Sequence, residues 1–128
     1  MLGKPYILNP IEAKDDRIEL VVDKKGILAT EQVAILIAQV YESQSYIEIT
    51  IFTVRKEHRK NGIGKCMIKK LKEFAKTHSI EQIVVHAIPY DFYDENAELL
   101  DINTLKEIYE KCGFVFLENK RKGYIDVC

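Results

Sequence analysis

Hydrophobic and polar positions alternate along residues 47–54. Isoleucines alternate with Glu48 and Thr50, and a phenylalanine and further β-branched residues complete the run. An extended chain points successive side chains to opposite faces, so this alternation is typical of a strand with one buried face. The pattern predicts a strand from Glu48 to Val54.

A helical period follows this strand. From residue 63 onward, apolar residues recur every three to four positions and lysines occupy the other side. Residues three and four apart lie on one side of a helix, so this spacing predicts an amphipathic helix from Ile63 to Lys76. The apolar side consists of Ile63, Met67, Leu71, Phe74 and Ala75, and the lysine side of Lys65, Lys69, Lys70, Lys72 and Lys76.

Shorter runs predict the remaining elements. We expect strands at 18–22, 27–30, 33–41 and 82–87, a turn at 23–26, a helix at 103–111 and a closing hairpin of 114–117 with 124–127. The spacing of the apolar residues in 33–41 fits a buried helix as well as a strand, but the β-branched side chains of this segment favour a central strand. Residues 82–87 follow the long helix, so we expect them to run parallel to the first strand after a crossover.

The turn between the first strand and the long helix carries two glycines and two cations. Gly62 and Gly64 allow positive φ and close approach to the main chain, and Arg59 and Lys60 add positive charge. The first turn of a helix has unpaired N–H groups that bind phosphate. Spacing excludes a nucleotide P-loop, which needs glycine at position 59, and a dinucleotide loop, which needs glycine at position 67.

Composition limits the kind of molecule. A chain of 128 residues, 47% hydrophobic and 30% charged, fits a single domain over residues 1–128. The net charge of -1 gives no general attraction to nucleic acid or to a membrane surface.

Three widely spaced cysteines suit neither a disulfide framework nor a zinc site, so we expect free thiols and no metal. With no apolar run of signal or membrane-span length, the expected location is cytoplasmic.

Two separate segments resemble the GNAT superfamily, the GCN5-related N-acetyltransferases. Arg59, Gly62 and Gly64 fit the family's acetyl-CoA motif, [RQ]-x-x-G-x-[GA], after a strand that ends in valine. Residues 108–114, IYEKCGF, look like its Y-x-K-x-G-F segment, and the similar regions together span roughly residues 31–118. The resemblance implies an α/β fold with a mixed, partly splayed β-sheet flanked by helices.

The resemblance also implies acetyl-CoA as cosubstrate. In that fold the pantetheine arm lies between the two splayed parallel strands and bonds to their main chain, and the pyrophosphate lies on the glycine loop. The cofactor-binding residues that this implies are Phe52, Thr53, Val54, Arg59, Lys60, Asn61, Gly62, Ile63, Gly64 and Lys65.

The implied reaction is acetyl transfer to a primary amine by direct attack in a ternary complex. Glu48 matches the general-base glutamate of the histone acetyltransferase branch, where EIVFCAV resembles residues 48–54. Tyr109 stands where many members have a tyrosine that protonates the departing thiolate. We therefore expect Glu48 and Tyr109 to be catalytic; the alternatives are a solvated strand glutamate and a packing tyrosine.

Several segments depart from the family pattern. Residues 1–46 show no helical period, although members have one or two helices that wall the acceptor pocket. We therefore expect an acceptor side that is either shortened or supplied by the second subunit of a homodimer. Asn103 is one position from the usual asparagine and is expected to be a helix N-cap. His86 is expected to be a core residue rather than a base.

Residues 88–101 are either an acidic, aromatic lid for a cationic amine or a solvated loop.

Two other functions remain open from the residues alone. One is a non-catalytic CoA-binding module that regulates or scaffolds. The other is nucleic-acid binding through the lysine side of the long helix, which is disfavoured because aromatic residues do not interleave with the lysines. The acceptor amine is not determined, since similarity of fold fixes the donor better than the acceptor.

Overall fold

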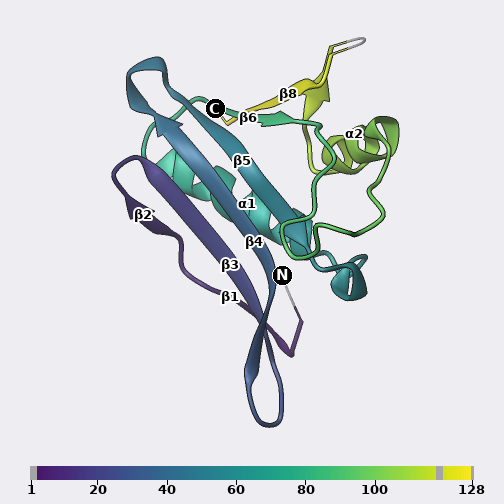
Figure 1. The fold of residues 1–128 in the computed structure, drawn as a ribbon. Helices are drawn as coiled ribbons and strands as arrows, with labels where there is room; N and C mark the ends of the chain where they lie inside the picture. Colours follow the sequence, from purple (N-terminus) through teal and green to yellow (C-terminus); the bar gives the residue numbers. More distant parts are fainter. Residues whose placement is uncertain (1–2, 118–119, 128) are drawn as a thin grey trace.

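The computed structural model describes residues 3–117 and 120–127, and this part of the chain forms one eight-stranded sheet with two α-helices (Figure 1). The strands are β1 (Tyr6–Leu8), β2 (Glu12–Lys14), β3 (Arg17–Lys25), β4 (Thr30–Tyr41), β5 (Tyr46–Val54), β6 (Gln82–His86), β7 (Val115–Phe116) and β8 (Lys122–Asp126). The helices are α1 (Ile63–Thr77), α2 (Ile102–Lys111) and the short 3₁₀ helices η1 (Glu42–Gln44) and η2 (Lys56–His58).

The strand order confirms the predicted mixed sheet. The order is β1-β3-β4-β5-β6-β8-β7, and β2 pairs with β3 beside that path. These neighbours are antiparallel except β5 and β6, which are parallel. A parallel pair needs a crossover, and α1 supplies it.

The strands β5 and β6 separate after a short parallel ladder, as expected. Their register runs from Tyr46↔Gln82 to Glu48↔Val84, although β5 continues to Val54. On the other side of β5, the register with β4 shifts between Ile37 and Ala38, which leaves Thr50 as an extra residue. Such a bulge bends a strand and redirects its side chains. The Thr50 hydroxyl donates to the Ile37 carbonyl at 3.0 Å and holds the bulge in place.

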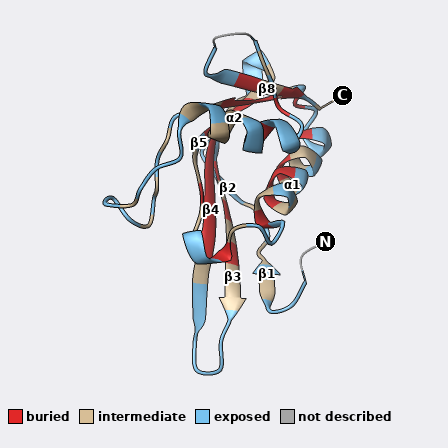
Figure 2. Ribbon diagram, turned by 90° about the vertical axis from the view of Figure 1, so that its right-hand side faces the viewer, coloured by how far each residue is buried: buried red, intermediate tan, exposed pale blue. Residues whose placement is uncertain are grey.

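The helix α1 packs its apolar side on the sheet, and Figure 2 shows its buried residues turned toward the strands. Met67 and Leu71 are fully buried, as are Ile18, Leu36 and Ile83 on the strands. Burying such a side chain is worth about 1.5–3 kcal/mol. The predicted side included Phe74, which is half-buried, and left out Ile68, which is buried.

Before β5, the described part of the chain consists of strands, turns and the short 3₁₀ helix η1, without an α-helix. Between residue 3 and the start of β4, the described chain forms strands and turns, in agreement with the predicted shortened region. The predicted turn at 23–26 and strand at 27–30 were wrong in their boundaries. Residues 23–25 continue β3, and the Gly26 N–H donates to the Ala29 carbonyl at 3.0 Å across the hairpin tip. Ile27 and Leu28 therefore project fully into solvent.

The last helix begins one residue before its predicted start. Its N-cap is Asp101, whose carboxylate accepts from the Thr104 N–H at 2.9 Å, so the expectation that Asn103 is the cap was wrong. Gly113 follows the helix with a φ of 105°, as the predicted C-terminal cap requires. The predicted closing hairpin is present as β7 and β8, although residues 118–119 of its turn lie outside the described residues. None of the described helices is both long and apolar enough to cross a membrane.

Candidate active site

The glycine loop lies between η2 and α1. Gly62 is the N-cap of α1 with a φ of 76°, and no side chain caps the helix there. A Cβ added at Gly62 would meet nothing within 4 Å, so the space above the loop is open. Lys60 also has a positive φ, of 68°. The loop thus turns the first N–H groups of α1 toward open space, which is the arrangement that binds phosphate.

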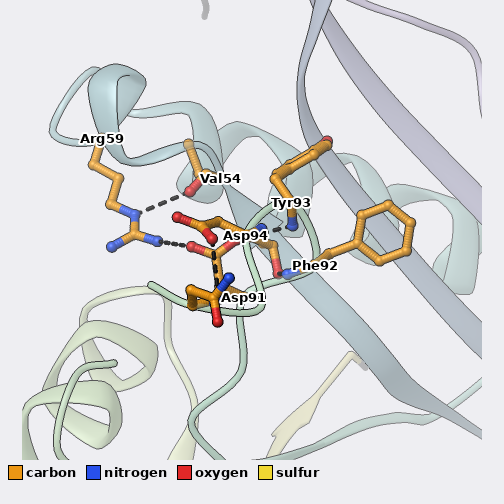
Figure 3. Close-up of polar contacts among 8 residues, drawn as sticks. Val54, Arg59, Asp91, Phe92, Tyr93 and Asp94 are labelled. Atoms are coloured by element: carbon orange, nitrogen blue, oxygen red, sulfur yellow. Dashed lines mark hydrogen bonds and ion pairs between the residues drawn. The ribbon is translucent and has the colours of Figure 1, made fainter. Parts of the chain in front are cut away.

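Arg59 is held at the side of this loop by two partners (Figure 3). Its Nε donates to the Val54 carbonyl at 2.9 Å, and its Nη2 lies 3.5 Å from Oδ2 of Asp91. The Asp91 side chain is 7% exposed and that of Arg59 is 34% exposed. The guanidinium therefore keeps a solvent-facing part, but one acidic group already lies against it.

The predicted cofactor residues gather around a single cavity of about 1000 Å³. The cavity extends from the glycine loop along the separating strands to α2, and residues 88–91 and 98–100 form a further wall. Of the predicted site, Glu48, Phe52, Thr53, Val54, Arg59, Lys60, Gly62, Ile63, Gly64, Lys65 and Tyr109 line it. Asn61 does not. Its amide donates to the His58 carbonyl at 3.1 Å and to the Tyr6 hydroxyl at 3.3 Å, so it braces the loop from outside.

Glu48 lies where β5 and β6 begin to separate, and it is paired with His86. The Nε2 of His86 is 2.9 Å from Oε2 of Glu48, with side-chain exposures of 38% and 29%. Desolvation, followed by the charges of Glu48 and Tyr46, raises the pKa of Tyr41 on the neighbouring strand β4. His86 was expected to be a core residue bonded to backbone; the structure instead gives it a carboxylate partner and places it on the cavity wall.

Tyr109 projects from α2 into an aromatic group beside the cavity. Its ring centroid is 6.2 Å from that of Phe52, 5.7 Å from Phe114 and 6.3 Å from Phe116. The residue is 6% exposed, and burial, with a smaller contribution from Cys112, raises the pKa of Tyr109 to about 12. The hydroxyl thus stays protonated at neutral pH and can donate a hydrogen bond into the cavity.

Residues 88–101 fold back over the C-terminal end of β5. The Phe92 N–H donates to the Thr53 hydroxyl at 3.3 Å, and the Arg55 guanidinium stacks on the Tyr93 ring at 3.9 Å (Figure 3 shows the acidic turn of this segment). Burial raises the pKa of Tyr93 to about 12, and its hydroxyl is buried without a hydrogen-bond partner among the described residues. The segment thus lines the cavity although most of residues 88–101 are exposed to solvent, and Asp91 and Arg55 were not predicted to hold it.

Within residues 3–117 and 120–127, no three side chains of His, Cys, Asp or Glu are grouped to hold an ion.

Solved structures share this fold at low sequence identity. Tetrahymena GCN5 has a TM-score of 0.64 and 12% identity, over 90% of this chain and 71% of that one. An aminoglycoside 6'-N-acetyltransferase complexed with coenzyme A has a TM-score of 0.63 and 18% identity, over 89% and 74%. The spermidine/spermine N-acetyltransferase SpeG from Vibrio cholerae has a TM-score of 0.59 and 18% identity, over 88% and 66%.

The sequence itself matches one family. A search of curated proteins gives no significant match. The family profile described as Acetyltransferase (GNAT) domain, in contrast, matches residues 16–116, which is most of the chain. With the glycine loop, the separated parallel strands and the shared fold, this match shows that the chain belongs to the GNAT family of acetyltransferases.

Proposed function

We propose that the protein is an N-acetyltransferase that moves the acetyl group of acetyl-CoA to a primary amine by direct attack in a ternary complex. The observation that carries this proposal is the single cavity that joins the glycine loop to Glu48 and Tyr109. A donor held on the loop would have its thioester within the same space as groups able to move protons. Family membership supports acyl transfer as the class of reaction.

The donor site is assigned to the loop and to β5. The pyrophosphate would lie on the N–H groups that follow Gly62, beside Arg59 and Lys60. The pantetheine arm would lie along residues 52–54, where β5 has already left β6 and all three residues line the cavity. This direction brings the thioester toward Glu48, at the point where the strands separate.

The chemistry requires a proton acceptor and a donor to the leaving group. An alkyl-ammonium titrates near pH 10.4, so it must lose a proton before its nitrogen attacks the carbonyl carbon. Glu48, with His86 against it, supplies the accepting group. A thiol titrates near 8.5, so a Tyr109 phenol held at a pKa of about 12 is suited to give the departing thiolate a hydrogen bond rather than its proton.

The acceptor is assigned only as a primary amine. Arg59, Lys60 and Lys65 line the cavity at the loop assigned to the donor, and Asp91 lies against Arg59. The other two carboxylates of the lining, Glu48 and Glu98, would favour a cationic acceptor. Two of the structural neighbours are named for acting on aminoglycosides and on spermidine or spermine, which are polycationic amines. Such amines are therefore the first candidates.

The test is release of free thiol from acetyl-CoA by the intact protein, with spermidine, an aminoglycoside, a lysine peptide and an N-terminal peptide amine as acceptors. We expect saturable thiol release with at least one amine, and mass spectrometry should find one added acetyl group on its nitrogen. Binding of acetyl-CoA without turnover on a wider amine panel would overturn the enzyme and support a non-catalytic CoA-binding module.

A further inference from the structure

The Glu48–His86 pair lies at the point where the two parallel strands separate. Register pairing of β5 with β6 ends at Glu48↔Val84, and His86 follows Val84 by two residues. Side chains two apart on a strand share a face, so His86 lies on the same side as Val84 and reaches back across the opening to Glu48. The sheet itself therefore fixes the 2.9 Å contact between Nε2 and Oε2.

We infer that His86 is the residue that accepts the proton from the amine, and that Glu48 positions and stabilises its imidazole. This inference rests on the proposed N-acetyl transfer and replaces Glu48 with His86 as the base. Three observations distinguish the two residues: the hydrogen bonding of the carboxylate, the free nitrogen of the imidazole, and the exposure of the ring.

The carboxylate of Glu48 is bonded to the imidazole of His86 through Oε2. A carboxylate in this position orients the ring and decides which of its two nitrogens is left free. Glu48 is thus placed to hold His86 in a fixed orientation.

The imidazole of His86 has one nitrogen in use and one free. An ionised carboxylate only accepts hydrogen bonds, so the neutral ring must carry its hydrogen on Nε2, facing Glu48. Nδ1 then has its lone pair available, and it has no hydrogen-bond partner among the described residues. The side chain is 38% exposed and lines the cavity. A carboxylate behind an imidazole also stabilises the imidazolium that forms when the ring takes a proton.

The other charged and titratable groups around His86 come from several elements. Glu48 lies on the adjacent strand β5, and Lys122 is the register partner of His86 on β8. Tyr109 on α2 and Glu98 in the covering segment line the same cavity as His86. Of these groups, Glu48 is the one bonded directly to the ring.

The proton and bond changes balance. The ammonium gives one proton to Nδ1 of His86, and the neutral nitrogen attacks the thioester carbonyl carbon. The new N–C bond forms as the C–S bond breaks, and the nitrogen's second proton passes to the thiolate through solvent, giving an acetamide and coenzyme A. The imidazolium then returns its proton to water, so each turnover releases one proton.

The experiment compares His86→Gln with Glu48→Gln in the full chain, through kcat and kcat/KM from pH 5 to 9. Glutamine at position 86 can still donate to Glu48 but cannot take a proton. We expect His86→Gln to lose about 10²–10⁴-fold in kcat and to lose the acid limb of the pH profile, because the variant no longer has a base at this position that must be deprotonated. Glu48→Gln should lose less and keep that limb. The affinity for acetyl-CoA should be unchanged in both variants.

Two results would overturn the inference. His86→Gln with nearly full activity, beside an inactive Glu48→Gln, would make Glu48 the base and His86 its positioning partner. Nitrogen NMR of the wild-type protein gives a second readout that needs no variant to fold, because the chain has only 3 histidines to assign. We expect the neutral His86 ring to carry its hydrogen on Nε2; a hydrogen on Nδ1 would contradict the proposed acceptor. Wild-type binding of acetyl-CoA with no transfer to any amine would instead end the proposed function, and this inference with it.

Discussion

Two walls of the same cavity are built in different ways. The wall to which the donor is assigned above, called the donor wall, comprises β5, the glycine loop and α1, and its core residues Met67 and Leu71 are fully buried. The covering wall, residues 88–101, has no helix or strand and is held by contacts with Thr53, Arg55 and Arg59. The donor wall is thus fixed by local sequence and core packing, whereas the cover depends on a few polar contacts.

The largest difference between the two walls should appear in stability. Leu71→Ala leaves a cavity in the fully buried side of α1 and should cost about 2–5 kcal/mol in the free energy of unfolding. Leu100→Ala changes a side chain that is 36% exposed in the cover and should cost less than about 1 kcal/mol. Chemical denaturation measures both. Equal losses would mean that the cover is part of the core.

The next effect should separate chemistry from packing at Tyr109. Tyr109→Phe keeps the ring beside Phe52 and Phe114 and removes only the hydroxyl. We expect kcat to fall about 10- to 100-fold. This loss is smaller than the one expected for removal of a general acid, because the phenol donates a hydrogen bond and keeps its proton. Acetyl-CoA affinity and thermal stability should change little. An unchanged kcat would leave Tyr109 as a packing residue.

A smaller effect should show how the cover acts on the donor wall. In the wild-type protein, Oδ1 of Asp91 accepts a hydrogen bond from the Tyr93 N–H at 2.9 Å. Asp91→Asn removes the negative charge beside Arg59 and keeps an oxygen that can accept this hydrogen bond. Acetyl-CoA should then bind about two- to tenfold more tightly at low salt, since its phosphates meet less repulsion. Calorimetric titration at two salt concentrations tests this. Weaker binding would show that Asp91 is needed to orient Arg59.

The smallest effect concerns the end of the cover, at the N-cap of α2. Bonds from the Thr104 N–H and hydroxyl lower the pKa of Asp101 below its usual 3.8. Because the pKa of Asp101 is lower in the folded protein than in the unfolded chain, these bonds stabilise the fold fully above about pH 3.8. Their contribution is lost as the pH falls through the folded-state pKa. Asp101→Ala should therefore lower the melting temperature at pH 7 more than at pH 3. A difference that does not change with pH would show that the carboxylate charge contributes nothing.

The donor wall could be predicted from sequence because its signals are local. The alternation that ends at Val54 and the spacing from Ile63 gave a strand and a helix with nearly the observed bounds. The glycine motif placed the loop between them. The predicted strand at 27–30 was wrong because a turn forms there. Ile27 and Leu28 are residue types that favour strands, but the hydrogen bond between Gly26 and Ala29 places them at a hairpin tip.

The remaining site features depend on the tertiary structure. The pairing of Glu48 with His86 needs the register between β5 and β6, which no periodicity reveals. The contact between Arg59 and Asp91 joins residues far apart in sequence, through a segment without regular structure. The catalytic roles of Glu48 and Tyr109 stay predictions, although both residues line the same cavity.

Acetyl-CoA is proposed to bind on the loop that ends in Gly62. The most direct measurement is calorimetric titration of acetyl-CoA into the wild-type protein, Gly62→Asn and Gly62→Asp. Both substitutions put a side chain of similar shape into the open space and into the same φ of 76°, which Asn and Asp tolerate better than most residues. Only Asp adds negative charge where the pyrophosphate should lie.

We predict micromolar binding by the wild-type protein, modestly weaker binding by Gly62→Asn, and a further loss of at least about tenfold in Gly62→Asp, which corresponds to about 1.4 kcal/mol. Equal affinities for the Asn and Asp variants, or no binding by a folded wild-type protein, would contradict the assignment of this loop as the donor site.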